Sequence, residues 1–139
     1  MKGKIDMLDK NNLIVIYGTG GSYKSSLGVS IINNYDNSCY INLDSNKHLK
    51  VNDNIKVFDK VDSLEFLKNC IKEYDITLID YIELLKISNE KLLELKDLVK
   101  SENKTLIIIS CCSSNKDLMN NNHYNELKEI TDLMILTDK

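Results

Sequence analysis

The stretch that decides the fold runs from Val15 to Ser26 and reads VIYGTGGSYKSS. It begins as an apolar strand, passes through a loop of small residues and enters a segment with helical spacing. It follows the phosphate-loop pattern GxxxxGK[ST] except at one position, where Tyr23 replaces the second glycine. Such a loop places backbone N–H groups around a phosphate, and the positive end of the following helix adds to the attraction. The sequence therefore predicts a phosphate-binding loop over Gly18–Ser26.

Side chains within this loop have separate expected roles. The ammonium group of Lys24 is expected to reach the outer phosphates, and the Ser25 hydroxyl is expected to ligate Mg²⁺. At position 23 a glycine would let the backbone approach a phosphate without a Cβ in the way. Tyr23 either narrows the loop or turns its ring away and shields the nucleotide. The residues expected to contact the nucleotide are Gly18, Thr19, Gly20, Gly21, Ser22, Tyr23, Lys24, Ser25 and Ser26.

Two acidic residues follow apolar strands further along the chain. The strand Ile76–Ile79 closes on Asp80, which is expected to hold Mg²⁺ through water. Asp44 comes directly after Tyr40–Leu43, and a carboxylate there can polarise the water that attacks a γ-phosphate. The alternative for Asp44 is a cap of a turn or helix. Because parallel strands end at one edge of a sheet, both carboxylates are expected beside the loop.

Polar residues also follow the strand Thr105–Ile109. Ser110 and Cys111 are placed to sense a γ-phosphate, and the alternative is an ordinary strand end. Two other readings of the loop itself remain open: a small-residue turn with a lysine there by chance, and a degenerate loop that no longer binds.

Strand-like and helix-like segments alternate along nearly the whole chain, which indicates one α/β domain over residues 1–139 with a mainly parallel sheet covered on both faces. Residues 1–11 are either a flexible start or an edge element. Ser63 or Asp62 is expected to cap the second helix, and Ser88 the third. Strands are expected at 13–17, 39–43, 55–58, 76–79, 105–109 and 133–136. Helices are expected at 24–34, 64–71, 88–102 and 123–130.

Composition narrows the function further. The 139 residues are 42% hydrophobic and 28% charged, which is typical of a folded domain. The apolar runs are strand-sized and no secretory leader is visible, so a cytoplasmic protein without a membrane span is expected. The net charge of −3 gives no broad basic surface for nucleic acid. The four cysteines lack zinc-ligand spacing and are expected to be reduced, with Cys39 and Cys70 in the core.

All 18 basic residues are lysines. Without arginine, the chain has no guanidinium clamp for phosphate and no arginine finger to offer an identical neighbour. Small P-loop kinases use lid arginines, so this class is disfavoured. The segment Asn115–Asp117 is similar to the NKxD motif of GTPases, but its aspartate comes one residue early. No DxxG glycine follows Asp80, which disfavours a GTPase as well.

Taken together, these elements resemble a minimal RecA-like P-loop ATPase core over about residues 12–136, and the loop is most similar to RepA-type hexameric helicases and their phage or plasmid relatives. The resemblance implies a three-layer P-loop NTPase fold with strand order 3-2-4-5-1-6. It implies ATP and Mg²⁺ as ligands, and it makes Lys24 and Asp44 the catalytic residues. A cation acting from a neighbouring subunit would have to be a lysine such as Lys116, Lys128 or Lys139, or come from another protein.

The function expected from this resemblance is slow, Mg²⁺-dependent ATP hydrolysis in DNA replication, recombination or plasmid or phage maintenance. The expected partners are further copies of the chain or another protein, with single-stranded DNA as a candidate ligand. The alternative is a nucleotide-gated assembly or regulatory subunit with weak or no hydrolysis. Tyr23 and the absence of arginine favour this alternative.

Overall fold

A computed structural model describes residues 12–19, 23–43, 50–80, 82–112 and 130–137 of the chain. Strands and helices alternate along these residues, as the apolar periodicity predicts. The elements in chain order are β1 (Leu13–Thr19), α2 (Lys24–Ile32), β2 (Ser38–Asn42), β3 (Lys56–Phe58), α3 (Leu64–Glu73), β4 (Ile76–Asp80), the 3-10 helix η1 (Ile82–Leu85), α4 (Asn89–Ser101), β5 (Thr105–Cys112) and β6 (Leu133–Thr137).

The six strands form one sheet in the order β3-β2-β4-β5-β1-β6. All five neighbouring pairs are parallel. The predicted fold class and strand order are therefore confirmed. Since all the strands run in one direction, their carboxyl ends lie along one edge of the sheet, where open parallel sheets bind ligands.

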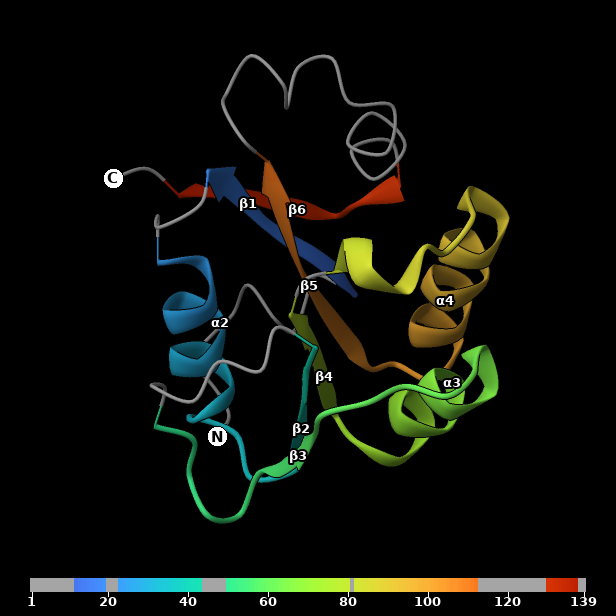
Figure 1. Cartoon of the computed structure of the whole chain (residues 1–139). Coiled ribbons are helices and arrows are strands. Elements are labelled where there is room, and N and C mark those ends of the chain that lie inside the picture. Colours follow the sequence, from blue (N-terminus) through green and yellow to red (C-terminus); the bar gives the residue numbers. More distant parts are fainter. Residues whose placement is uncertain (1–11, 20–22, 44–49, 81, 113–129, 138–139) are drawn as a thin grey trace.

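Helices cover both faces of the sheet and make a three-layer structure (Figure 1). Helix α2 packs on one face, against β4 and β5, and α3 and α4 pack together on the other. Each face has its own buried apolar cluster. The cluster under α2 includes Ile14, Tyr40 and Leu78, whereas the cluster under α3 and α4 includes Val15 and Ile79. This alternation along β1 and β4 follows from the two-residue period of a strand.

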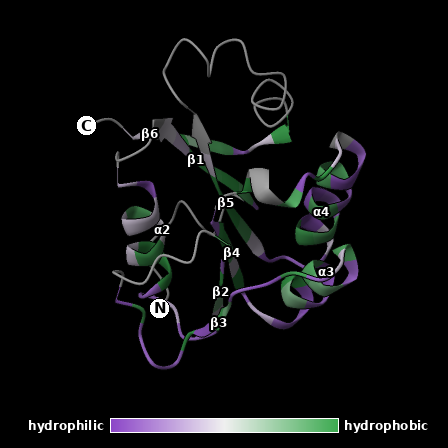
Figure 2. Ribbon diagram, in the orientation of Figure 1, coloured by the Kyte–Doolittle hydropathy of each residue, from purple (hydrophilic) through white to green (hydrophobic). Residues whose placement is uncertain are grey.

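The hydropathy of the chain matches these layers. The central strands are apolar along their length, and α3 and α4 turn hydrophilic residues away from the sheet (Figure 2). Two predicted caps are present: the Ser63 hydroxyl accepts a hydrogen bond from the Phe66 N–H, and the Ser88 hydroxyl accepts one from the Lys91 N–H. None of the helices that the structure describes is long and apolar enough to cross a membrane.

Some boundaries differ from the sequence prediction. Strand β5 continues to Cys112, beyond the predicted end at Ile109, because it pairs with β1 as far as the register Thr19↔Cys112. Helix α2 ends at Ile32, and η1 was not predicted. The predicted element within residues 1–11 and most of the predicted helix 123–130 lie outside the described residues.

At the amino edge of the sheet, Asp132 ties three elements together. Its Oδ2 accepts hydrogen bonds from the Asn12 and Leu13 N–H groups at 2.9 and 3.0 Å. Its Oδ1 lies 3.2 Å from the Lys96 ammonium nitrogen, which also donates to the Ile130 carbonyl. Burial raises the pKa of Asp132, but these donors together outweigh it and hold the pKa below its usual range. The carboxylate thus fixes the starts of β1 and β6 against α4.

Candidate functional site

The predicted phosphate loop leaves the sheet from one of its interior strands. Strand β1 lies between β5 and β6, and Gly18 is in register with Cys111 on one side and Thr137 on the other. The backbone of the loop therefore starts from a strand that is hydrogen-bonded on both sides. Gly20, Gly21 and Ser22, which continue the loop, lie outside the described residues.

Tyr23 re-enters the described chain in a left-handed conformation, with φ 63° and ψ 30°. Its carbonyl accepts the first hydrogen bond of α2, from the Leu27 N–H at 3.1 Å. Left-handed backbone is unfavourable for a bulky residue, whereas glycine adopts it freely. This is a physical reason for the glycine in the phosphate-loop pattern at this position. The Tyr23 ring is 74% exposed, so its side chain does not pack into the protein.

Lys24 is the first residue of α2 and is buried, with 8% of its surface exposed. Ser25 is half-buried and Ser26 is exposed. The first turn of a helix already carries positive partial charge from its N–H groups. With no acidic residue in that turn, the Lys24 ammonium adds to the same charge. Such a concentration of positive charge is suited to a polyanion such as a triphosphate.

Glycine at position 28 lets α2 lie close to the sheet. A Cβ on Gly28 would stand 3.1 Å from both Ile109 Cδ1 and Leu78 Cδ1. Both partners are core residues, 2% and 0% exposed. Because Gly28 is one helical turn after Lys24, this close packing sets how far Lys24 and Ser25 stand from the carboxyl ends of β4 and β5.

Asp80 is the last residue of β4 and is only 2% exposed. It follows Ile76 and Leu78 at the two-residue period of a strand, and both of these belong to the apolar cluster under α2. Its side chain thus lies on the same face as α2. The Tyr40 hydroxyl donates a hydrogen bond to Asp80 Oδ2 at 2.7 Å. Asn42, also buried, is the direct neighbour of Asp80 across β2 and β4.

The structure therefore brings Lys24 and Asp80 to the same face at the same edge of the sheet. Asp44, the predicted catalytic carboxylate, follows the end of β2 by two residues and lies outside the described residues. So do Lys116, Lys128 and Lys139. The assignment of these four residues stays a prediction.

The position of Ser110 favours the second of its two expected roles, that of an ordinary residue at the strand end. It sits within β5 rather than after it, is buried and is in register with Tyr17 of β1. Its neighbour two residues back, Ile108, belongs to the cluster under α3 and α4. Ser110 therefore faces away from α2, on the side of the sheet opposite Asp80. This position favours a structural role over contact with a γ-phosphate.

The site also fits the chemistry of a magnesium ion. Mg²⁺ prefers oxygen ligands and usually keeps several waters, so one or two protein groups beside substrate phosphates are enough to hold it. Asp80 supplies a buried carboxylate and Ser25 a hydroxyl at this edge. Across the described part of the chain, no three His, Cys, Asp or Glu side chains cluster as they would in an all-protein metal cage.

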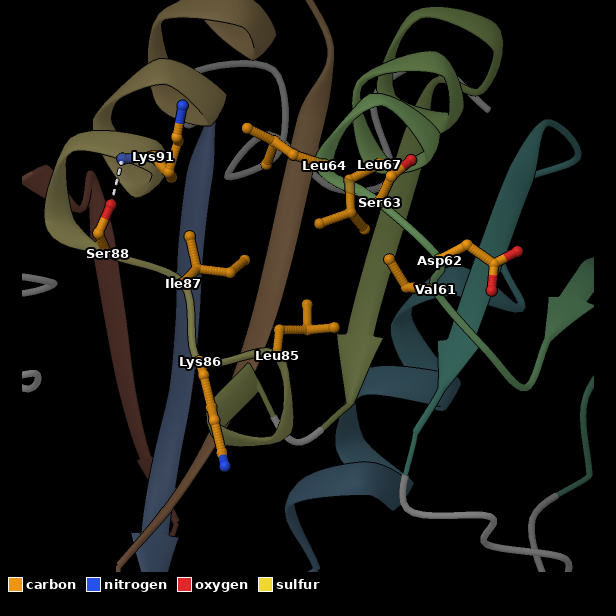
Figure 3. Close-up of a pocket in the computed structure, with 10 residues that line it drawn as sticks. All are labelled: Val61, Asp62, Ser63, Leu64, Leu67, Leu85, Lys86, Ile87, Ser88 and Lys91. Carbon is orange, nitrogen blue, oxygen red and sulfur yellow. Dashed lines mark hydrogen bonds between the residues drawn. The ribbon is translucent and has the colours of Figure 1, made fainter.

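A hollow of about 400 Å³ lies on the face of α3 and α4 (Figure 3). The starts of both helices and the end of η1 border it. Half of the residues that line it are apolar, and Lys86 and Lys91 are among the polar ones. It is separated from Lys24 and Asp80 by the sheet, so it is not part of the candidate nucleotide site.

Two cysteines lie buried in the apolar cluster under α3 and α4. Cys39 of β2 and Cys70 of α3 are free thiols, as the sequence predicts. A hydrogen bond with Cys70 and burial both raise the pKa of Cys39. Neither thiol is on the face that carries Asp80, and both are packing residues.

The contact between Tyr40 and Asp80 was missed from the sequence. A tyrosine in an apolar strand is ordinarily a core residue, and nothing in a single strand shows which polar group its hydroxyl reaches. The signal lies in the pairing of β2 with β4. Once Tyr40 is in register with Leu78, Asp80 is the diagonal neighbour on the same face.

Comparisons with known proteins agree with this architecture. The chain is similar to the crystal structure of a KaiC-like protein from the hyperthermophilic archaeon Pyrococcus horikoshii, with a TM-score of 0.63 and 15% identity over 92% of this chain and 74% of that one. The fold is RecA-like. A DNA replication initiation factor also matches, with a TM-score of 0.54 and 15% identity over 96% of this chain. The chain spans 43% of that factor's length.

Comparisons of sequence, unlike those of structure, find no match. No protein-family model matches the chain, and no curated protein matches it. At 15% identity the structural likeness establishes the RecA-like fold alone.

Proposed function

We propose that this chain binds a nucleoside triphosphate, taken to be ATP, together with Mg²⁺ at residues 18–26, and hydrolyses it slowly. The observation that carries the proposal is the placement of buried Lys24 at the start of α2 on the same face and edge of the sheet as buried Asp80. A cation at a helix N-terminus beside a carboxylate suits a phosphate chain that carries a metal ion.

Each residue would then have a defined task. Backbone N–H groups of the loop hold the phosphates, and the Lys24 ammonium stabilises the negative charge that grows on the β- and γ-phosphates. Ser25 would ligate Mg²⁺ directly and Asp80 through water. Held there by Ser25 and Asp80, Mg²⁺ would neutralise part of the negative charge of the phosphates.

Hydrolysis also needs an oriented water. Asp44 would accept a proton from the water that attacks the γ-phosphate, so that an oxygen–phosphorus bond forms as the bond to the β-phosphate oxygen breaks. The products are a nucleoside diphosphate and inorganic phosphate. The reaction is proposed to be slow because the chain has no arginine to stabilise the transition state from a neighbouring copy.

The wider role is proposed from the likenesses. A solved structure titled a DNA replication initiation factor shares the fold, which supports action in DNA replication, recombination or plasmid or phage maintenance. The proposed partners are further copies of this chain or another protein, with single-stranded DNA as a candidate ligand and the cytoplasm as the compartment. The loop's similarity to RepA-type helicases supports the same role.

A second function is a nucleotide-gated assembly or regulatory subunit that binds but hardly hydrolyses. The left-handed backbone of Tyr23 favours this second function, because strain in the phosphate loop is expected to weaken the stabilisation of the transition state. The two functions share the binding site and differ only in turnover.

Calorimetric titration with ATP, ADP and GTP, with and without Mg²⁺, tests binding. ATP turnover with and without single-stranded DNA then separates the two functions. Lys24→Ala is expected to abolish binding, and Asp44→Asn to keep binding and lose turnover. Lys60→Ala, which removes an exposed lysine outside the site, is the matched control. If the wild-type protein binds no nucleotide at millimolar concentration, the proposed function is wrong.

A further inference from the structure

Tyr40 and Asp80 form a buried polar pair within the apolar cluster under α2. Tyr40 is 1% exposed and Asp80 is 2% exposed. The Tyr40 hydroxyl donates to Asp80 Oδ2 at 2.7 Å, the usual length of an O–H···O hydrogen bond. The two residues belong to neighbouring strands, with Tyr40 in register with Leu78, two residues before Asp80. The phenol thus reaches diagonally towards the carboxyl edge of the sheet.

This bond restrains a side chain that is otherwise free to turn. The terminal torsion of an aspartate is broad, so burial alone does not fix where its two oxygens stand. With Oδ2 held by Tyr40, the carboxylate plane is set. Among the residues that the structure describes, no hydrogen bond to Oδ1 is found, and this oxygen remains to accept from a water.

We infer that Tyr40 is a positioning residue for the metal ion: it holds Asp80 by Oδ2 so that Oδ1 receives a water of the Mg²⁺ hydration shell. This rests on the proposed function and adds to it a residue outside the phosphate loop. A hydrogen bond behind a metal-facing carboxylate orients it and tunes its charge, and loss of such a bond typically weakens metal affinity by about 10- to 100-fold.

The rigid frame around the pair supports this role. Tyr40 stands on β2, which is paired on both sides, with β3 and with β4. Its ring is enclosed by the same apolar cluster that holds α2. A donor on such a strand is held in place by hydrogen-bonded neighbours on both sides. The strand that supports the predicted Asp44 therefore also orients Asp80.

The test compares Tyr40→Phe with wild type in its need for Mg²⁺. The variant keeps the ring and removes only the hydroxyl. We expect the Mg²⁺ concentration that gives half-maximal tightening of ATP binding to rise by about 10-fold. ATP binding measured in EDTA should stay within about twofold of wild type, since Lys24 and the loop are unchanged. Tyr74→Phe removes the hydroxyl of a half-buried tyrosine outside the site and is the matched control.

A merely structural role for Tyr40 gives a different result. In that case Tyr40→Phe lowers ATP binding equally with Mg²⁺ and in EDTA, and the inference is overturned. It is also overturned if the variant keeps the Mg²⁺ dependence of wild type. A rescue experiment gives positive support for the inference. 4-Aminophenylalanine at position 40 retains a hydrogen-bond donor and is expected to bring the Mg²⁺ dependence back towards wild type.

A second measurement needs no variant that could fail to fold. Tyrosine labelled with ¹³C at Cζ reports on the hydroxyl, and the Tyr40 resonance is expected to shift when Mg²⁺ is added to the ATP-bound wild-type protein. An unmoved Tyr40 resonance at saturating Mg²⁺ overturns the inference. If the wild-type protein binds no Mg²⁺–ATP at all, the proposed function fails together with it. If wild type binds and only the Tyr40 effects are missing, the inference fails alone.

Discussion

Gly28 of α2 packs against Leu78 of β4 so closely that a Cβ on Gly28 would stand 3.1 Å from Leu78 Cδ1. The helix that carries Lys24 therefore lies this close to the sheet because residue 28 has no Cβ. This contact connects the backbone of the candidate site to the most buried layer of the molecule.

The first prediction concerns this contact. Gly28→Ala gains helix propensity of about 1 kcal/mol, but its Cβ would stand 3.1 Å from buried Leu78 and Ile109, and such overpacking of a core costs about 1–3 kcal/mol. We expect a net loss of about 1 kcal/mol in the free energy of unfolding, measured by urea denaturation. Combining Gly28→Ala with Leu78→Val makes space and should recover part of that loss. If the double variant loses as much stability as the two single variants together, the packing explanation is contradicted.

The second prediction concerns the backbone of Tyr23. A left-handed conformation costs a non-glycine residue about 1–2 kcal/mol. Glycine avoids this cost, but its greater conformational freedom in the unfolded chain offsets part of the gain. Tyr23→Gly should therefore raise the free energy of unfolding by about 1 kcal/mol. Tyr23→Ala keeps the unfavourable φ and should bring no such gain. Equal gains in both variants would show that the exposed ring, and not the backbone, is the source.

The third prediction concerns acid stability. Because the pKa of Asp132 is depressed in the folded protein, its carboxylate stabilises the fold above the ordinary aspartate pKa, and this contribution is lost as the pH falls through the folded pKa. Asp132→Asn should lower stability at pH 7 by about 1 kcal/mol, since solvent partly screens the group. It should also flatten the loss of stability as the pH falls below the ordinary aspartate pKa of about 4.

Asp97→Asn is the control for this experiment, because Asp97 is an exposed acid on α4. Its pH profile should follow that of wild type. A steep acid transition that survives in Asp132→Asn would assign the transition to other carboxylates.

The fourth prediction concerns the cap of α3. Ser63→Ala removes the hydroxyl that accepts from the Phe66 N–H and should cost about 1 kcal/mol in thermal or urea unfolding. Ser63→Asp offers another good capping side chain and should lie close to wild type. If both variants lose the same stability, the hydroxyl acts through some other contact.

Much of this architecture could be predicted because periodicity and local chemistry agree along the chain. The strand before Gly18 and the caps at Ser63 and Ser88 were read from neighbouring residues alone. Strand order followed from the resemblance to RecA-like proteins and is confirmed in the described sheet. Lys24 was recognised by its loop, since few other contexts place a lysine after so many small residues at the start of a helix.

What could not be predicted depends on contacts between distant segments. The end of β5 is set by its pairing with β1 and not by its own composition, so Ser110 was expected one step beyond the strand. The Tyr40–Asp80 hydrogen bond joins two strands, and the sequence of neither strand alone shows how they pair. The close seat of Gly28 likewise depends on side chains about 50 and 80 residues further along the chain.

The position of β1 between β5 and β6 has a consequence for how the protein acquires its shape. Leu13 pairs with Leu106 and Ile14 with Leu133, so the first described strand meets its neighbours only after nearly all the intervening chain has been made. Contacts of such long sequence separation form slowly, because the loop must be closed before they contribute. On the ribosome, the phosphate loop would thus be organised late, and a growing chain that has not yet reached Thr105 would leave β1 exposed to chaperones.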